Sequence, residues 1–307
     1  MDRQTHRRRS GLHRTNSLLK SLEKIKNGRE AVSPAISTVV LTGAIVTMLV
    51  ATIPFARNYL NVTTARFEFS SMELSMQNMA LQLDDVAWTI GRTQTFHYTS
   101  NFGWVSFSPL SLCYTVYVDK GSGYALFANY STGILMFKMA TNMYSLGNNY
   151  FQPLFPSGTS FLENGTAAPI SHVFTVEKLP MSDGSYIRVV VAPSIRMLNT
   201  AISTVNTTTV NTTNYCNFYL PILVAGSSSY TSQSVRLVGN AISLNTISLN
   251  MTSPLQKVKI QVSFPQDLAG FDETFFNFDN LTKEVSVAAG SIIQFYTMSI
   301  TVLLGVS

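Results

Sequence analysis

The longest apolar segment of the chain covers residues 31–56, which contain no charged side chain. A run of about 20 apolar residues is enough to cross the hydrocarbon core of a bilayer as a helix. Ser33 is a favourable N-cap, and Pro34 suits the first helical turn, where its missing N–H costs no hydrogen bond. The segment therefore predicts a transmembrane helix, and Pro54 near its far end predicts a kink because it cannot donate a hydrogen bond to Val50.

Small residues recur at every fourth position through the middle of this segment. Gly43, Thr47 and Ala51 lie on one face of the predicted helix, and such a strip lets two helices approach closely in lipid. Because these residue types are common in membrane spans, the strip is compatible with a helix–helix interface and equally with a helix surrounded by lipid alone. Together with Pro54, these positions are the candidates for packing within the membrane.

A second helical pattern follows directly, over residues 57–92. Its apolar residues are spaced by three and four positions, as in a helix with one apolar face, and Glu68, Glu73 and Asp84 lie off this face. The pattern allows two interpretations, which can both hold: an amphipathic stalk helix packed on its own domain, or a stalk that associates with other copies. The adjacent acids Asp84 and Asp85 point in different directions on a helix, which favours a solvated face. The apolar positions are Val62, Ala65, Phe69, Met72, Met76, Met79, Leu83, Val86 and Ile90.

From about residue 93 the spacing of apolar residues changes from helical to alternating. Segments that alternate in this way are typical of β-strands, and they occur at residues 113–118, 186–191, 257–264 and 296–302. Turn-forming residues separate them at 119–123, 182–184 and 226–229. The stretch 199–217, rich in Thr and Asn, is expected to be an exposed loop.

The C-terminal stretch 288–307 is apolar enough to be compared with a second membrane span. Gln294, Ser299 and Thr301 alternate with apolar residues in it, the content of β-branched residues is high, and no basic segment follows. These features favour a β-strand.

The predicted fold class is α+β: a long N-terminal helix, with a transmembrane half and an extracellular amphipathic half, followed by a β-rich, sandwich-like head. The expected organisation is a basic cytoplasmic tail or leader at 1–30, a transmembrane helix at 31–56, a stalk helix at 57–92 and a β-rich extracellular domain at 93–307.

The charge distribution predicts the orientation in the membrane. The chain of 307 residues has a formal net charge of +5, and residues 1–30 contain nine Lys or Arg residues against three acids. A basic segment before the first apolar span stays in the cytoplasm by the positive-inside rule. We therefore expect a single-pass protein of the cell membrane, with its N-terminus in the cytoplasm and its C-terminal domain outside the cell.

Both cysteines, Cys113 and Cys216, fall in the predicted extracellular part. They are compatible with one disulfide in an oxidising exterior and equally with two buried thiols. The same part carries Asn-x-Ser/Thr sequons, which are candidate glycosylation sites of a cell-surface glycoprotein. These are Asn129, Asn164, Asn206, Asn211, Asn250 and Asn280; a further sequon, Asn61, lies close to the predicted membrane surface and is the least favoured.

The sequence offers no pattern typical of catalysis. Four histidines occur; His6 and His13 lie in the basic tail, while His97 and His172 stand outside any metal-ligand spacing. No nucleophile elbow, P-loop or dinucleotide-binding glycine motif is present. We therefore expect no enzyme activity, no cofactor or metal and no nucleic-acid partner.

The segment beginning Ala31-Val-Ser-Pro-Ala-Ile, behind a basic stretch, resembles the N-terminal segment of archaeal type IV pilin-like and archaellin-like proteins. The resemblance covers roughly residues 24–56. It implies that the apolar helix bundles with copies of itself or with related subunits, and that a prepilin-type peptidase removes the leader.

The leader boundary departs from the family pattern, in which the cut lies after a basic and a small residue directly before the helix. Here the charged residues Arg29 and Glu30 stand between Gly28 and Ala31, so residues 28–31 are the candidate cleavage region. The function depends on whether the leader is removed or retained. A processed chain would be a minor or pseudo-pilin, a structural subunit of an archaeal type IV pilus-like assembly; an unprocessed chain would be a stand-alone, membrane-anchored adhesin or binding protein. An ectoenzyme is the least supported reading.

Overall fold

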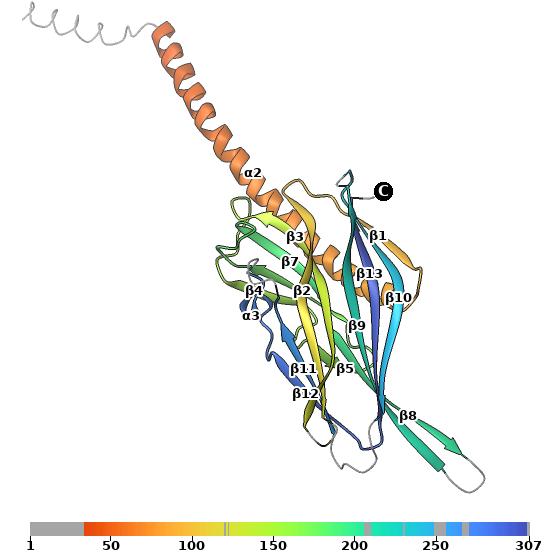
Figure 1. Cartoon of the computed structure of the whole chain (residues 1–307). Coiled ribbons are helices and arrows are strands. Elements are labelled where there is room, and N and C mark those ends of the chain that lie inside the picture. Colours follow the sequence, from red (N-terminus) through yellow and green to blue (C-terminus); the bar gives the residue numbers. More distant parts are fainter. Residues whose placement is uncertain are drawn as a thin grey trace, which may run out of the picture. The chain divides into compact units, whose positions relative to one another are not determined.

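The computed structural model describes residues 34–119, 121, 123–205, 210–229, 231–248, 256–265 and 270–305. The chain forms two compact units, Met1–Asn61 and Val62–Ser307. In chain order the elements are α2 (Pro34–Ala87), β1 (Thr93–His97), β2 (Gly103–Asp119), β3 (Tyr124–Ala140), β4 (Tyr150–Phe155), β5 (Leu162–Asn164), β6 (Ser171–Glu177), β7 (Tyr186–Pro193), β8 (Ile195–Val205), β9 (Val210–Ser228), β10 (Ser234–Ser248), β11 (Gln256–Ser263), α3 (Glu273–Phe276), β12 (Thr282–Val287) and β13 (Ile292–Leu304) (Figure 1).

Helix α2 begins at Pro34, as expected of a proline in the first turn, and contains residues of both units. Pro54 lies inside it, and the helix continues on both sides of this residue. The chain therefore has one long N-terminal helix followed by a strand-rich domain, in agreement with the predicted α+β class.

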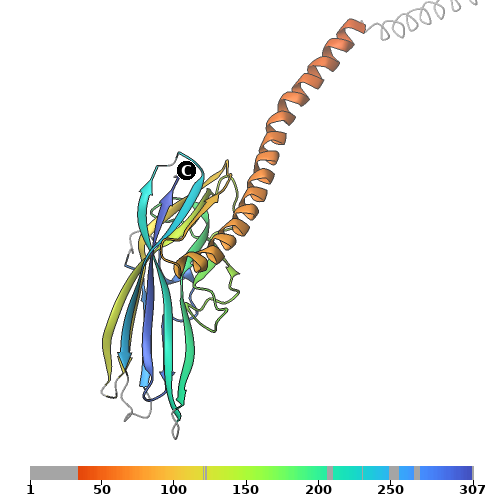
Figure 2. The same ribbon diagram turned by 90° about the vertical axis from the view of Figure 1, so that its right-hand side faces the viewer.

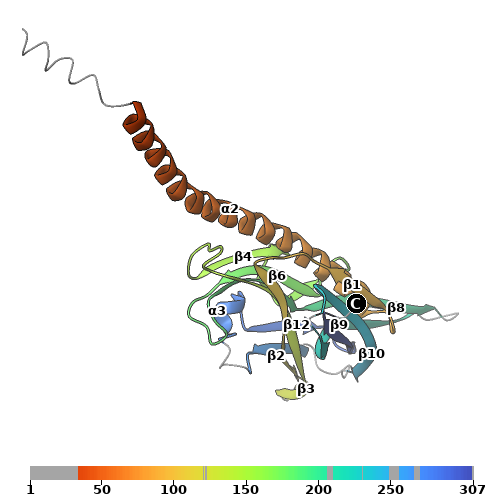
Figure 3. The same cartoon turned by 90° about the horizontal axis from the view of Figure 1, so that it is seen from above.

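The strands form two curled sheets (Figures 1 and 3). The six-stranded sheet has the order β1-β10-β13-β9-β8-β5, and the seven-stranded sheet has the order β12-β11-β2-β3-β7-β6-β4. Neighbouring strands are antiparallel except for two parallel pairs, β9 with β13 and β5 with β8. The predicted strands at 113–118, 186–191 and 296–302 lie within β2, β7 and β13, and β11 covers all but the last residue of the fourth, so the alternating pattern was a reliable signal; the C-terminal stretch is confirmed as a strand.

Two local predictions are wrong. The stretch 199–217 is not a loop, because β8 and β9 pair antiparallel from Arg196 opposite Tyr219 to Val205 opposite Val210. Its threonines and valines favour extended backbone, so a polar composition does not prevent strand pairing. The predicted turn at 226–229 lies largely within β9, where Gly226 is needed for close packing: a Cβ atom there would lie 2.6 Å from side-chain atoms of Thr301 and Leu303.

Apolar side chains on both faces of the central strands form the hydrophobic core. In β3, Ile134 and Met136 belong to one buried cluster, while Leu135 and Phe137 belong to another. The first cluster combines residues of both sheets, and the second combines both sheets with α2. Since a strand presents alternate residues to opposite faces, two covered faces require a continuous apolar run.

The second helical pattern lies in the part of α2 that runs along the strand-rich domain (Figure 2), and its apolar stripe packs on that domain. The buried members of the stripe are at most 3% exposed: Ala65, Phe69, Met72, Met76, Met79, Leu83 and Val86. This confirms intradomain packing and excludes these buried side chains from contact with another copy. The two ends of the predicted stripe differ, because Val62 is 42% and Ile90 is 63% exposed, and Ile90 lies beyond the last residue of α2.

Candidate functional sites

The apolar part of α2 is the first candidate surface. Large side chains from Ile36 to Leu60 are exposed, and Val39 and Phe55 are 69% and 76% exposed. Among the described residues, α2 is the one helix that is long and apolar enough to cross a membrane, and none of its most apolar window is buried. Contiguous apolar surface of this size marks a membrane or protein interaction site.

The predicted small-residue strip lies on this exposed part. Gly43, Thr47, Ala51 and Pro54 are all exposed, and apart from the adjacent residues and the nearby helix backbone no atom lies within 4 Å of the position that a Cβ on Gly43 would take. The hydroxyl of Thr47 donates to the carbonyl oxygen of Gly43 at 2.8 Å. Because this hydrogen bond lies within the helix, the strip offers no unpaired hydroxyl to an apolar environment.

Acidic side chains of α2 hold the strand-rich domain to the buried stripe. Glu68 Oε1 accepts hydrogen bonds from the backbone N–H groups of Asn101 and Phe102, at 2.8 and 3.0 Å, and from the hydroxyl of Ser100. This carboxylate therefore satisfies the backbone of the loop between β1 and β2. Charge-assisted hydrogen bonds of this kind are stronger than neutral ones.

Asp84 makes a similar anchor near the end of α2. Its two carboxylate oxygens accept from both terminal nitrogens of Arg196 at 3.0 Å, and Oδ1 also accepts from Trp88 Nε1 at 2.8 Å. The guanidinium of Arg196 lies over the rings of Trp88 and Tyr219. The interpretation of Asp84 and Asp85 as a solvated pair is therefore wrong for Asp84, since a partner from a distant strand reaches it.

Glu73 is a third anchor, and it is half-buried. Its Oε1 accepts from the hydroxyl of Thr175 in β6 at 2.6 Å. Burial raises the pKa of Glu73 above its usual value, and the hydrogen bond from Thr175 opposes that shift. The three acids lie off the apolar stripe, as the pattern predicts, but they face the domain instead of solvent.

The two cysteines are buried free thiols, so the disulfide considered for Cys113 and Cys216 is not formed in this structure. Cys216 belongs to the first core cluster, and burial raises the pKa of its thiol to about 12. Leu112 and Tyr114 face the same cluster, so strand alternation turns Cys113 to the opposite side of β2. There its thiol donates to Asn129 Oδ1 at 2.6 Å.

The described sequons are accessible. Asn61, Asn129, Asn164 and Asn280 are exposed. The sequons Asn206 and Asn250, the side chain of Asn211, and the candidate cleavage residues Gly28, Arg29, Glu30 and Ala31 lie outside the residues that the structure describes.

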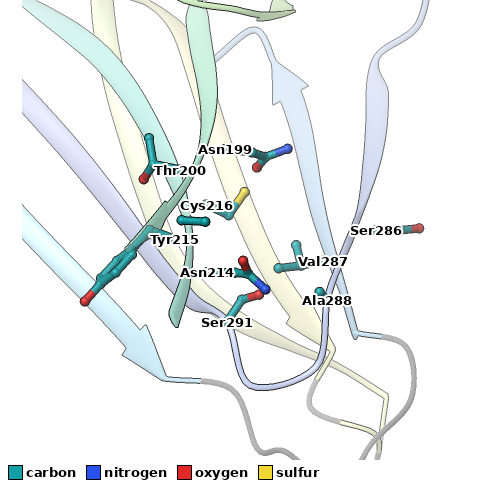
Figure 4. A pocket seen from close by; sticks show the side chains of 10 residues that line it. Asn199, Thr200, Asn214, Tyr215, Cys216, Ser286, Val287, Ala288 and Ser291 are labelled. Atoms are coloured by element: carbon teal, nitrogen blue, oxygen red, sulfur yellow. The ribbon is translucent and has the colours of Figure 1, made fainter. Parts of the chain in front are cut away.

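A polar cleft of about 410 Å³ is a second candidate surface, and sequence reasoning missed it (Figure 4). It lies where the β8–β9 pair meets the connection from β12 to β13. Its lining carries amides, hydroxyls and one phenol, with no charged side chain: Asn199, Thr200, Ala201, Asn214, Tyr215, Cys216, Ser286, Val287, Ala288 and Ser291. Such a lining suits neutral polar ligands, because amides and hydroxyls both donate and accept hydrogen bonds.

The two described histidines differ in environment. His97 is exposed in β1, whereas His172 is 4% exposed in β6, and burial lowers its pKa to about 4. Within the described ranges, no group of three His, Cys, Asp or Glu residues could hold a metal ion.

No protein-family model, no curated protein and no solved structure matches the chain.

Proposed function

We propose that the chain is a structural subunit, a minor or pseudo-pilin, of an archaeal type IV pilus-like surface assembly. One observation carries this proposal: the apolar part of α2 is exposed on all sides, while the following part of the same helix is buried in the strand-rich domain. A helix of this composition suits a bilayer and, after extraction, the interior of a helical bundle. In this view α2 carries a sandwich-like head.

The charge of the N-terminal segment supports the orientation within this proposal. The basic residues 1–30 remain in the cytoplasm, the head lies outside the cell, and its exposed sequons are glycosylated where the host has the enzymes. The partners are the bilayer, other copies or related subunits, and a prepilin-type peptidase.

The test is the N-terminus of the mature chain, measured by mass spectrometry on protein from native membranes. A start between residues 29 and 32 supports the pilin-like function. Recovery of chains that retain residues 1–30 contradicts it. A variant with both Arg29 and Glu30 replaced by Ala brings the boundary closer to the family pattern. It is expected to be processed to a greater extent than the wild type.

The polar cleft favours a second candidate function, a stand-alone anchored adhesin. Its uncharged amides and hydroxyls suit a neutral saccharide. Binding of the full chain to a panel of neutral oligosaccharides tests this function. Asn214→Ala is expected to abolish binding and Gln152→Ala, on the distant strand β4, to leave it unchanged; equal binding by both variants contradicts it.

A further inference from the structure

The terminal strands of both sheets are protected against pairing with another chain. In the seven-stranded sheet, β12 carries Lys283 and Glu284, and β4 contains Pro153 beside a register shift. In the six-stranded sheet, β5 spans three residues and β1 spans five. Charge, proline, irregular pairing and short length are the usual ways in which proteins prevent edge-to-edge association.

One of the long stretches of edge, in β10, carries neither charge nor proline, although a register shift lies at its start, between Gly239 and Ala241. Strand β1 covers β10 only as far as Val238, and the backbone contacts that follow end at Gly239, which bonds to Gly91 and Arg92. Beyond this point, Asn240 lies at the register shift, residues 241–248 pair with β13 on one side, and no other described strand pairs with residues 240–248 (Figure 1). Every second residue of such a stretch directs its N–H and C=O groups away from its single neighbour.

The composition of residues 240–248 suits an added strand. The sequence NAISLNTIS contains no charged residue and no proline. Ile242 and Leu244 are 38% and 46% exposed. An exposed, long and partly hydrophobic edge strand is a template for another strand.

The face of β10 opposite to Ile242 and Leu244 packs on the domain. Asn245 Nδ2 donates to the hydroxyl of Tyr130 in the other sheet at 2.9 Å, and Ile247 packs against the first core cluster. The edge is therefore held in extended form by the ladder to β13 and by these contacts, so little conformational entropy remains to be lost on pairing.

We propose that residues 240–248 pair antiparallel with the same residues of a second copy of this chain, which joins the six-stranded sheets of two heads across a two-fold axis. The backbone groups that face away from β13 can pair with an added strand, and a second copy always brings an identical free edge. An uncharged strand meets no like-charge repulsion when it faces itself, whereas β12 would place its Lys283 and Glu284 beside their equivalents. Isologous two-fold contacts are also the commonest in homo-oligomers.

This inference does not depend on leader processing or on the transmembrane helix. A two-fold contact between heads can form in a filament, between filaments or between anchored single chains. The N-terminal mass, which tests the proposed function, is therefore independent of the cross-linking that tests this contact.

The test is cysteine cross-linking of the full-length chain in native membranes. Single cysteines are placed at each of positions 242–246, and Gln152→Cys on the protected strand β4 is the matched control. The native Cys113 and Cys216 are buried, which limits background. Across a two-fold axis one position lies opposite itself, at a Cβ separation that a disulfide can bridge. The expected result is a product of twice the chain mass, strongest at one position and weaker on both sides of it.

A charged variant gives the second readout. Leu244→Lys places like charges close together on the paired edges, and it is expected to reduce the dimer fraction of the detergent-solubilised chain by about fivefold, with an unchanged circular dichroism spectrum. Gln152→Lys is expected to leave the dimer fraction unchanged. Cross-linking at 242–246 no stronger than at 152, a product that is not twice the chain mass, or an unchanged dimer fraction in Leu244→Lys would each overturn the proposal.

Discussion

The two parts of α2 are both rich in apolar residues, yet they meet different environments. In residues 36–60 large apolar side chains point in all directions and are exposed, whereas in residues 65–86 one stripe is buried and acids flank it. A helix that is apolar all round needs a non-aqueous environment, while one with a single apolar face can bury it on its own domain. The comparison teaches that the distribution of apolar residues around a helix, more than their number, indicates its partner.

The largest expected effect comes from removing one side chain of the buried stripe. Phe69→Ala is expected to lower the free energy of unfolding of the head by about 3–5 kcal/mol, because Phe69 is 2% exposed and contacts the rings of Phe137 and Tyr144. Urea denaturation followed by tryptophan fluorescence measures it. Phe67→Ala, two residues away and 71% exposed, is the control, with an expected change within about 0.5 kcal/mol. Equal effects of the two variants would contradict the assignment of the buried face.

The next largest loss of stability is expected at Asp84 and not at its neighbour Asp85. Asp84→Ala leaves the largely buried Arg196 without its bidentate partner and is expected to cost about 2 kcal/mol, less than a fully buried pair because Asp84 is 34% exposed. Asp85→Ala removes an exposed pair with Arg92 and is expected to cost less than about 1 kcal/mol. The urea midpoints of unfolding of the two variants measure this difference. Equal midpoints would contradict the role of Asp84 as an anchor.

A smaller effect is expected in the apolar part of α2. Gly43→Leu fills the small-residue strip and is expected to reduce helix–helix association by about tenfold, roughly 1.4 kcal/mol, while membrane insertion is retained. Cross-linking in native membranes measures association, and alkaline extraction measures insertion. Ile45→Leu, on the opposite face of the helix, is the control. Unchanged cross-linking of Gly43→Leu would show that the strip is not an interface.

The smallest effect concerns Glu73 and pH. Burial raises its pKa in the folded chain above the usual value of 4.5, so the folded state binds more protons than the unfolded state between these two values. The contribution of Glu73 to stability is therefore complete below pH 4.5 and is lost as the pH rises through the raised pKa. Glu73→Gln keeps an acceptor for Thr175, and urea titrations across this pH range are expected to show a flatter dependence than the wild type. An identical pH dependence would mean that burial of Glu73 has no energetic consequence.

Much of the fold could be predicted from local patterns. The stripe from Ala65 to Val86 and the alternation in β2, β7, β11 and β13 follow from periods that local geometry imposes. The β8–β9 pair was missed because a Thr- and Asn-rich composition is common to loops and to exposed strands. The polar cleft was missed with it, since its walls come from residues that lie far apart in the chain.

Three properties of the chain can be predicted from its sequence: an apolar helix long enough to span a membrane, a second helical stretch with one apolar face, and a domain of β-strands. These properties depend on the order of apolar and polar residues within single elements. Three further features become visible only in the folded chain: Asp84 meets Arg196, Cys113 and Cys216 face different sides of their sheets, and residues 241–248 pair with a described strand on one side only. Each of these depends on which distant strands become neighbours, and strand order is set by packing of the whole core, which no local period encodes.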